Sequence, residues 1–196
     1  MIDNKVRIRT SEELYTRKEE FLIVCDILDK LEIRYFLQTG ILLGAIRQND
    51  FIPWDWDVEI SVFADEVEKK LDLLINEITI SGFTIQKYFR ELFRLKVNFV
   101  GKYPRETTGY TIQAWNHNKK KKIFWRNKFK VPDELFKEMK EIEFFGKKHL
   151  APYPPENYLK YQYGENWKTP LRSSDKSIYM THHYSGISPI KVYFKK

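Results

Sequence analysis

Cysteine is almost absent from this sequence, with one residue among 196, and that scarcity excludes several classes of protein. No intrachain disulfide and no multi-cysteine zinc site can form, so a reducing compartment is the natural expectation. Cys25 falls among the apolar positions of a helical pattern, where a buried structural thiol is expected rather than a nucleophile. The four histidines, His117, His149, His182 and His183, show neither pairing with cysteine nor HExxH spacing, which argues against a zinc site.

Long apolar runs are also missing. No stretch reaches the roughly 18 consecutive apolar residues that a membrane-spanning helix requires. The polar opening residues 1–5 lack the apolar segment of a signal peptide, so we expect a cytoplasmic protein. Internal repeats, low-complexity stretches and long Gly/Ser-rich or Pro-rich linkers are absent as well, so residues 1–196 are expected to form a single domain.

What the sequence does contain is an apolar, aromatic-rich and basic chain. Hydrophobic residues make up 42% and aromatic residues 16%, enough for a sizeable core, which excludes a disordered chain, a collagen and a coiled coil. Lys and Arg number 34 against 27 Asp and Glu, so the net charge is 34 − 27 = +7. This excess is compatible with nucleic acid, an anionic membrane face, a phosphorylated substrate or simple solubility.

The densest basic cluster follows residue 118. It consists of residues 119–122, with Arg126, Lys128 and Lys130 beyond. A solvated hairpin turn is the main expectation, and a cationic rim that attracts an anionic substrate is the alternative. Aromatic residues interleave with these lysines, but the sequence has no recognised nucleic-acid motif, so no nucleic-acid partner is expected.

Hydrophobic periodicity predicts a mixture of helices and strands, and therefore an α+β fold with partly antiparallel strands. Thr10 and Glu13 form a capping-box pattern at the start of a first helix. Helices are predicted over residues 11–31, 42–47, 67–78 and 155–163, and strands over residues 35–37, 57–62, 83–88, 93–99, 109–115 and 123–131, with a hairpin turn at Gly146.

The most informative residues are three acids at even spacing, Asp55, Asp57 and Glu59. In extended backbone, residues i and i+2 point to the same side, about 6.6 Å apart along the strand, so these carboxylates can converge on one hard cation. Magnesium suits such a site because it binds one or two carboxylates and leaves other positions to water and substrate phosphates. The alternative is a solvated face of an edge strand, although aligned like charges repel one another.

Two glycines and an arginine precede the acids. Gly40 and Gly44 bracket a short segment in which backbone N–H groups could approach a phosphate at a helix start, and Arg47 could add a bidentate contact. The alternative is a turn glycine and a packing glycine. The order of strand, glycine-bearing turn, short helix and paired acids on the next strand is that of the nucleotidyltransferase fold.

This segment strongly resembles the signature of the LicD/fukutin family, GxLLGxxRxxxxIPWDxD followed by an aliphatic residue and an acid. The matching residues are Gly40, Leu42, Leu43, Gly44, Arg47, Ile52, Pro53, Trp54, Asp55, Asp57, Val58 and Glu59. The resemblance continues through Phe93 and Arg94, residues 112–115 and residues 144–167, and covers roughly residues 35–172. Trp56 and Val58 resemble the fukutin-related branch more than the bacterial phosphocholine branch.

The resemblance implies a nucleotidyltransferase-like fold with a mixed β-sheet flanked by helices. It implies transfer of a phospho-alcohol, such as phosphocholine or ribitol phosphate, from a CDP-activated donor to a hydroxyl of a cell-surface glycan or its precursor. The acceptor would be a glycan or a lipid-linked glycan, which leaves peripheral membrane association open. It also implies catalysis and Mg²⁺ (or Mn²⁺) binding by Asp55, Asp57 and Glu59. Its substrate and phosphate positions match Gly40, Leu43, Gly44, Arg47, Trp56, Arg94 and Gln113.

One position departs from the family pattern. The family usually places an aspartate on a later strand, in a pattern resembling I-D-[IL]-W, where this sequence has Gln113. Glutamine can coordinate or hydrogen-bond, but it cannot accept a proton as a carboxylate does. Asp55 or another acid then serves as the base, or the reaction relies on metal and positioning, or activity is reduced or lost. A nucleotidyltransferase acting on a small molecule or sugar, and a non-catalytic member that binds a nucleotide or glycan, therefore stay open.

Overall fold

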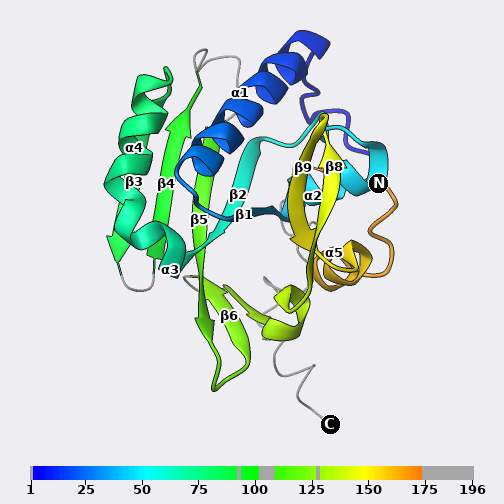
Figure 1. Ribbon diagram of the computed structural model, residues 1–196. Helices are drawn as coiled ribbons and strands as arrows, with labels where there is room; N and C mark the ends of the chain where they lie inside the picture. The colour runs from blue at the N-terminus through cyan, green and yellow to red at the C-terminus, as the bar shows by residue number, and fades with distance from the viewer. Residues whose placement is uncertain (1, 92–93, 102–108, 127–128, 174–196) are drawn as a thin grey trace.

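The computed structural model describes residues 2–91, 94–101, 109–126 and 129–173 (Figure 1). Phe93, Lys128, His182 and His183, which the sequence analysis mentions, lie outside these residues. The elements are α1 (Ser11–Lys30), β1 (Tyr35–Leu37), α2 (Thr39–Gln48), β2 (Asp57–Phe63), α3 (Ala64–Val67), the 3₁₀ helix η1 (Glu68–Lys70), α4 (Leu71–Ile80), β3 (Thr84–Glu91), β4 (Arg94–Val100), β5 (Gly109–Asn118), β6 (Ile123–Arg126), β7 (Phe129–Pro132), η2 (Asp133–Phe136), β8 (Met139–Phe144), β9 (Lys147–Pro152) and α5 (Pro155–Tyr163).

The described strands form one mixed sheet. Seven of them follow the order β3-β4-β5-β2-β1-β9-β8, and β6 and β7 extend from β5 as a hairpin ribbon. β2 pairs in parallel with β5, and β1 in parallel with β9, whereas the other neighbours are antiparallel. The prediction of an α+β fold with a mixed sheet flanked by helices is confirmed.

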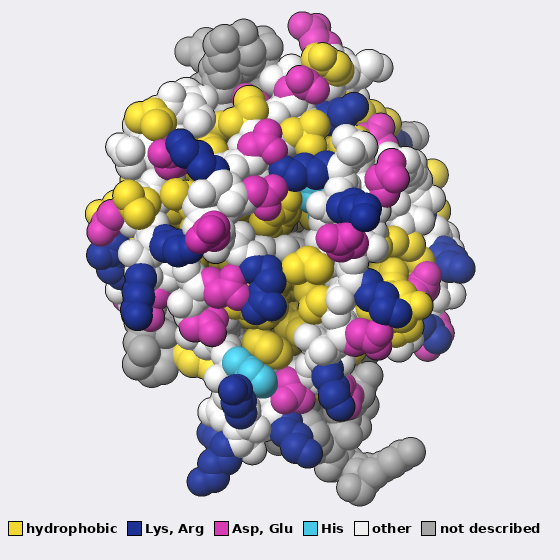
Figure 2. Space-filling model, in the orientation of Figure 1, with side chains coloured by type: hydrophobic (Ala, Val, Ile, Leu, Met, Phe, Trp, Pro, Cys, Tyr) yellow, Lys and Arg dark blue, Asp and Glu magenta, His cyan; other side chains and the backbone are white. Residues whose placement is uncertain are grey.

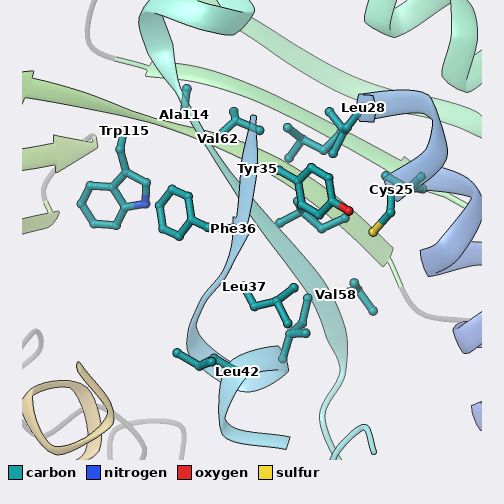
Figure 3. Close-up of a cluster of buried hydrophobic side chains, with 14 of the residues drawn as sticks. Cys25, Leu28, Tyr35, Phe36, Leu37, Leu42, Val58, Val62, Ala114 and Trp115 are labelled. Atoms are coloured by element: carbon teal, nitrogen blue, oxygen red, sulfur yellow. The ribbon is translucent and has the colours of Figure 1, made fainter. Parts of the chain in front are cut away.

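Side chains alternate along the central strands between two faces of the sheet. The helix-covered face is the one covered by α1 and α4 (Figure 1), and the other face carries the acids. Val58, Ile60 and Val62 on β2 are buried, and Figure 3 draws Val58 and Val62 in one cluster with Cys25 and Leu28 of α1. Helix α1 lies next to α4 (Figure 1). Asp57 and Glu59 point to the opposite side, since successive strand residues alternate between faces.

Helix α1 forms much of the core on the helix-covered face. It begins with the predicted capping box, in which Thr10 and Glu13 exchange side-chain to backbone hydrogen bonds. Its apolar stripe includes Phe21, Cys25 and Leu28, all fully buried, and Cys25 and Leu28 lie beside β1 (Figure 3). Burial raises the pKa of the Cys25 thiol to about 12, so the expectation of an inert structural cysteine is confirmed.

Two predicted elements differ in extent from those in the structure. Helix α2 begins at Thr39 rather than at residue 42, so Gly40 lies inside its first turn. The run 123–131 is two paired strands, β6 and β7, rather than one. Strand β2 begins at Asp57 as predicted, and the turn at Pro53 and Trp54 leaves Asp55 ahead of the strand.

The lysine-rich turn joins β5 to β6 at one end of the molecule. Residues 119–122 are all exposed, and Lys and Arg side chains gather at this end of the surface (Figure 2). The prediction of a solvated hairpin turn is therefore confirmed. The neighbouring aromatic residues Trp115 and Phe124 are buried and unavailable for stacking on bases. Among the helices that the structure describes, none has the length and apolarity needed to span a membrane.

Candidate active site

A cavity of about 460 Å³ lies on the face of the sheet that carries the acids, between strands β2, β4 and β5 and helices α2 and α5. This volume is within the range of ordinary ligand pockets. All the candidate residues from the sequence line it except Gly44, namely Gly40, Leu43, Arg47, Asp55, Trp56, Asp57, Glu59, Arg94 and Gln113. Residues that are far apart in the sequence thus line one cavity.

The carboxylate of Asp55 lies against the first turn of helix α2, and its position depends on the absence of a side chain at Gly40. A β-carbon on residue 40 would collide with Oδ2 of Asp55, so only glycine leaves room for this carboxylate. The first turn of a helix carries partial positive charge from its free N–H groups, which favours an anion there. In this conformation the space beside Gly40 is occupied by the carboxylate of Asp55. The sequence analysis had suggested that a substrate phosphate would approach the backbone there.

Two arginines from outside the motif hold the backbone of the acid-bearing loop. Arg9 donates from Nη1 to the carbonyl of Asp55 and from Nη2 to the carbonyl of Trp56, the latter at 3.2 Å. Arg17 on α1 is 1% exposed and donates to the Asp55 carbonyl at 2.8 Å. The backbone N–H of Arg9 also donates to the carbonyl of Pro53 at 2.8 Å. The sequence analysis missed both arginines, since Arg9 is 47 residues from Trp56 and Arg17 is 38 residues from Asp55, and no local pattern links them to the motif.

Burial and neighbouring acids raise the pKa values of Asp55 and Asp57. Burial is the largest cause for Asp55 and raises its pKa to about 6, with Glu59 adding to the rise and Arg17 and Arg9 opposing it. Burial also raises the pKa of Asp57 to about 7, reinforced by the charges of Glu59 and Asp55. The carboxylates are thus close enough to repel one another, as the sequence analysis anticipated.

Glu59 is held by three donors. Gln113 on the neighbouring strand donates to Oε1, and Thr39 and Arg126 donate to Oε2 at 3.3 and 3.4 Å. Thr39 has a φ of 50°, the left-handed conformation that non-glycine residues seldom adopt. Gln113, the residue that departs from the family pattern, therefore acts as a hydrogen-bond donor to an acid.

Carboxylate oxygens are the donors that magnesium prefers, and these acids fit such an ion chemically. Within the part of the chain that the structure describes, no three or more His, Cys, Asp or Glu side chains form a group that could hold a metal ion. A metal ligated by Asp55, Asp57 and Glu59 together remains a prediction, and in the described conformation a cation would have at most two of these carboxylates.

Cationic side chains surround the acids on the side of β4 and β6. Lys96 lies opposite Gln113 in the strand register, and burial lowers its pKa while Glu59 raises it. Arg126 is buried, with its guanidinium carbon 4.6 Å from the centroid of the Trp115 ring. Its Nε and Nη1 atoms are buried and have no hydrogen-bond partner among the described residues. The sequence analysis missed Lys96, although the alternation of Arg94, Lys96 and Asn98 along a strand is a signal that could have found it.

The far end of helix α2 forms the other side of the cavity. Gly44 packs there against the backbone, because a β-carbon would collide with the carbonyl oxygen of Asp50. The alternative of a packing glycine is therefore the one that the structure supports. Arg47 and Trp54 line the cavity, and Trp56 also lines it while 44% exposed.

The fold is similar to that of the antibiotic-resistance factor ANT(2'')-Ia. The TM-score is 0.54 at 10% sequence identity, and the match covers 84% of this chain and 80% of that chain. At such an identity the similarity establishes the fold alone.

Curated relatives match at low to moderate identity. The human ribitol 5-phosphate transferase FKRP is 24% identical over 160 residues, which are 75% of this chain and 31% of the relative. The human ribitol-5-phosphate transferase FKTN is 24% identical over 164 residues, 81% of this chain and 34% of the relative. The lipopolysaccharide cholinephosphotransferase LicD of Haemophilus influenzae is 36% identical over 69 residues, 32% of this chain and 26% of the relative. The chain thus matches about a third or less of the length of these relatives.

The family model described as LicD/FKTN/FKRP, nucleotidyltransferase domain, matches residues 32–154. This range contains α2, the acids of β2 and the cationic strand β4, and it ends before α5. More than half of the sequence is matched, including the motif from Gly40 to Glu59. The chain belongs to the LicD/FKTN/FKRP family.

Proposed function

We propose that this chain is a phosphotransferase that moves a phospho-alcohol from a CDP-activated donor to a hydroxyl of a cell-surface glycan or its precursor. Family membership and the activities named for FKRP, FKTN and LicD support the reaction class. The observation that carries the proposal is the placement of Asp57 and Glu59 beside Lys96 and Arg126 in one cavity. Phosphoryl transfer requires carboxylates that hold a metal cation and positively charged side chains that hold the phosphate groups.

The acids are the proposed metal site. Asp57 and Glu59 would hold Mg²⁺ or Mn²⁺, and Asp55 would add a ligand or serve as the base. A bound ion would neutralise charge on the transferring phosphorus and on the CMP leaving group. Gln113 and Thr39 support this role by fixing Glu59 through hydrogen bonds to both of its oxygens.

The cationic wall is the proposed phosphate site. Arg126 presents buried N–H groups without partners, and such groups gain most from an anionic acceptor in the cavity. Lys96 and Arg94 add positive charge from β4. With the donor held there, the acceptor hydroxyl attacks phosphorus in line. A new phosphorus–oxygen bond forms, the bond to CMP breaks, and the hydroxyl proton passes to a carboxylate, either Asp55 or another acid.

The test is a donor screen. The purified chain, with magnesium and a glycan acceptor extract, is incubated with CDP-choline, CDP-ribitol, CDP-glycerol or CDP-ethanolamine, and release of CMP is measured. We expect CMP release with at least one donor and its loss in Asp57→Asn. Release of pyrophosphate from a nucleoside triphosphate instead would identify a nucleotidyltransferase. Nucleotide binding without turnover would identify a non-catalytic member, and silence on every donor would overturn the proposal.

A further inference from the structure

The cavity has a second positively charged end, which the phosphate site does not use. Lys96 and Arg126 belong to β4 and β6, which both pair with β5, the neighbour of the acid-bearing strand β2. Arg47 instead lies in the last turn of α2, the helix whose first turn contacts Asp55 through Gly40. Arg47 is seven residues after Gly40 on the same helix, which separates their backbones by about 10.5 Å along the helix axis.

Arg47 is isolated from the acids. Burial lowers its pKa, and within the described part of the chain the charge that opposes this shift comes from Tyr163, whereas Lys96 responds to both Glu59 and Asp57. Its guanidinium carbon lies 6.0 Å from the centroid of the Trp54 ring. Trp54 is itself fixed by a hydrogen bond of 2.8 Å from Nε1 to the carbonyl of Leu171. Arg47 thus has an aromatic and apolar environment, without the carboxylates that dominate the centre of the cavity.

Two donor atoms of Arg47 are unpaired. Its Nε and Nη2 atoms are buried and have no hydrogen-bond partner among the residues that the structure describes. These two atoms lie on the same edge of the planar guanidinium, so their N–H bonds point in parallel toward a ligand with two adjacent acceptors. A buried donor without a partner costs about 1–3 kcal/mol, which a bound ligand would recover.

We propose that this end of the cavity binds the nucleobase of the donor, with Arg47 donating to two adjacent ring acceptors. The inference rests on the proposed function for the presence of a nucleotide. The O2 and N3 atoms of cytosine are such a pair, whereas uracil carries an N–H between its two carbonyl oxygens and would oppose one donor with another. Apolar side chains of Ile52, Trp54 and Trp167 line the same cavity and suit the faces of a flat ring.

A phosphate fits this end less well. A doubly charged group beside a single arginine in apolar surroundings would be incompletely neutralised and would lose its hydration. The acid-centred part of the cavity already has Lys96 and Arg126 for that purpose. The roughly 10.5 Å between Gly40 and Arg47 leaves space for a ribose between a phosphate held near the acids and a base.

The test compares ligands that differ only in the base. Calorimetric titration of the purified chain with CMP and UMP, in magnesium, is expected to show at least about tenfold tighter binding of CMP, the scale of one unpaired donor. In Arg47→Met the ratio is expected to fall to about one. In Arg47→Lys, which keeps the charge and loses the two parallel N–H donors of the guanidinium, the ratio of CMP to UMP affinity is expected to fall as well. Ribose 5-phosphate is the probe without a base, and its affinity should stay unchanged in both variants.

Lys96→Gln is the matched control. It should weaken CMP, UMP and ribose 5-phosphate equally and preserve the ratio. Melting temperatures of the variants verify that each is folded. The proposal is overturned if the unaltered chain binds neither nucleotide or binds both equally, or if Arg47→Met weakens ribose 5-phosphate as much as CMP. If no donor released CMP but the chain still bound CMP more tightly than UMP, the proposed reaction would be wrong and the proposed nucleobase site would still hold.

Discussion

The carboxylate of Asp55 occupies the space that a β-carbon on residue 40 would need. This contact joins the first turn of α2 to the loop ahead of β2, and it explains why a glycine precedes the acids. The contact also links the two halves of the family motif physically, since moving one displaces the other.

Gly40→Ala is expected to push Asp55 out of its position. The collision involves a carboxylate that burial and two arginines already restrain, so overpacking should cost about 1–3 kcal/mol of stability. CMP release should fall by more than the fraction of protein that the lower stability unfolds, because the displaced acid belongs to the proposed site. Thermal unfolding and the donor screen measure the two effects. Gly109→Ala is the control, since a β-carbon there meets nothing within 4 Å, and equal activity losses in the two variants would contradict the argument.

The pH dependence of stability should report the crowding of the acids. The pKa of Asp57 rises from 3.8 to about 7 and that of Asp55 to about 6, so the native state binds protons that the unfolded chain has released. Their contribution to stability is present below the unfolded value of 3.8 and is lost as the pH rises through about 6 to 7.

Asp57→Asn isolates this contribution. In EDTA the variant should melt at a higher temperature than the unaltered chain at about pH 7.5, by about 2–4 °C for each kcal/mol recovered, and this advantage should shrink at about pH 5. Magnesium should raise the melting temperature of the unaltered chain and not that of the variant. Glu165→Gln, at an exposed salt bridge with Lys160, is the control and should show neither effect. An advantage independent of pH would contradict the prediction.

Local sequence patterns predict the centre of this site well. The capping box, the alternation over residues 57–62 and the spacing of the acids depend on neighbours in the chain, and each is found in the structure. Asp55 is the exception. Its i, i+2 relation to Asp57 suggested one strand face, but the turn at Pro53 and Trp54 ends that periodicity and directs Asp55 toward α2.

The remainder of the site depends on strand register and tertiary contacts. Lys96 reaches the cavity only because β4 and β5 pair antiparallel with Lys96 opposite Gln113. Arg126 reaches Glu59 because β6 folds back on β5. Arg17 contacts the Asp55 carbonyl across 38 residues of sequence. No local periodicity encodes such long-range pairs, so the sequence could identify the acids but not the cations around them.

Restoring an acid at position 113 should make the site depend on a cation. Gln113→Glu replaces a donor to Glu59 with a like charge, so in EDTA the variant should be less stable than the unaltered chain. Magnesium should recover that loss if a cation binds between the two carboxylates. Gln113→Leu also removes the donor but adds no charge, so its loss should not respond to magnesium. Thermal unfolding with and without magnesium distinguishes the two, and identical behaviour would contradict the assignment of a metal to Glu59.

Arg9 should matter for activity more than for stability. Arg9→Ala removes the donors to the carbonyls of Asp55 and Trp56 and frees the loop that positions Asp55. Loss of positioning affects the transition state more than ligand binding, so we expect kcat for CMP release to fall about tenfold or more with little change in KM. Arg7→Ala is the matched control, because Arg7 is two residues away, is itself exposed, and pairs with the capping residue Glu13 instead of the acid-bearing loop. Arg9→Lys restores charge but not the two-pronged contact, so partial rescue at most is expected. If Arg9→Ala and Arg7→Ala reduced kcat equally, the contacts of Arg9 with the acid-bearing loop would have no part in positioning Asp55.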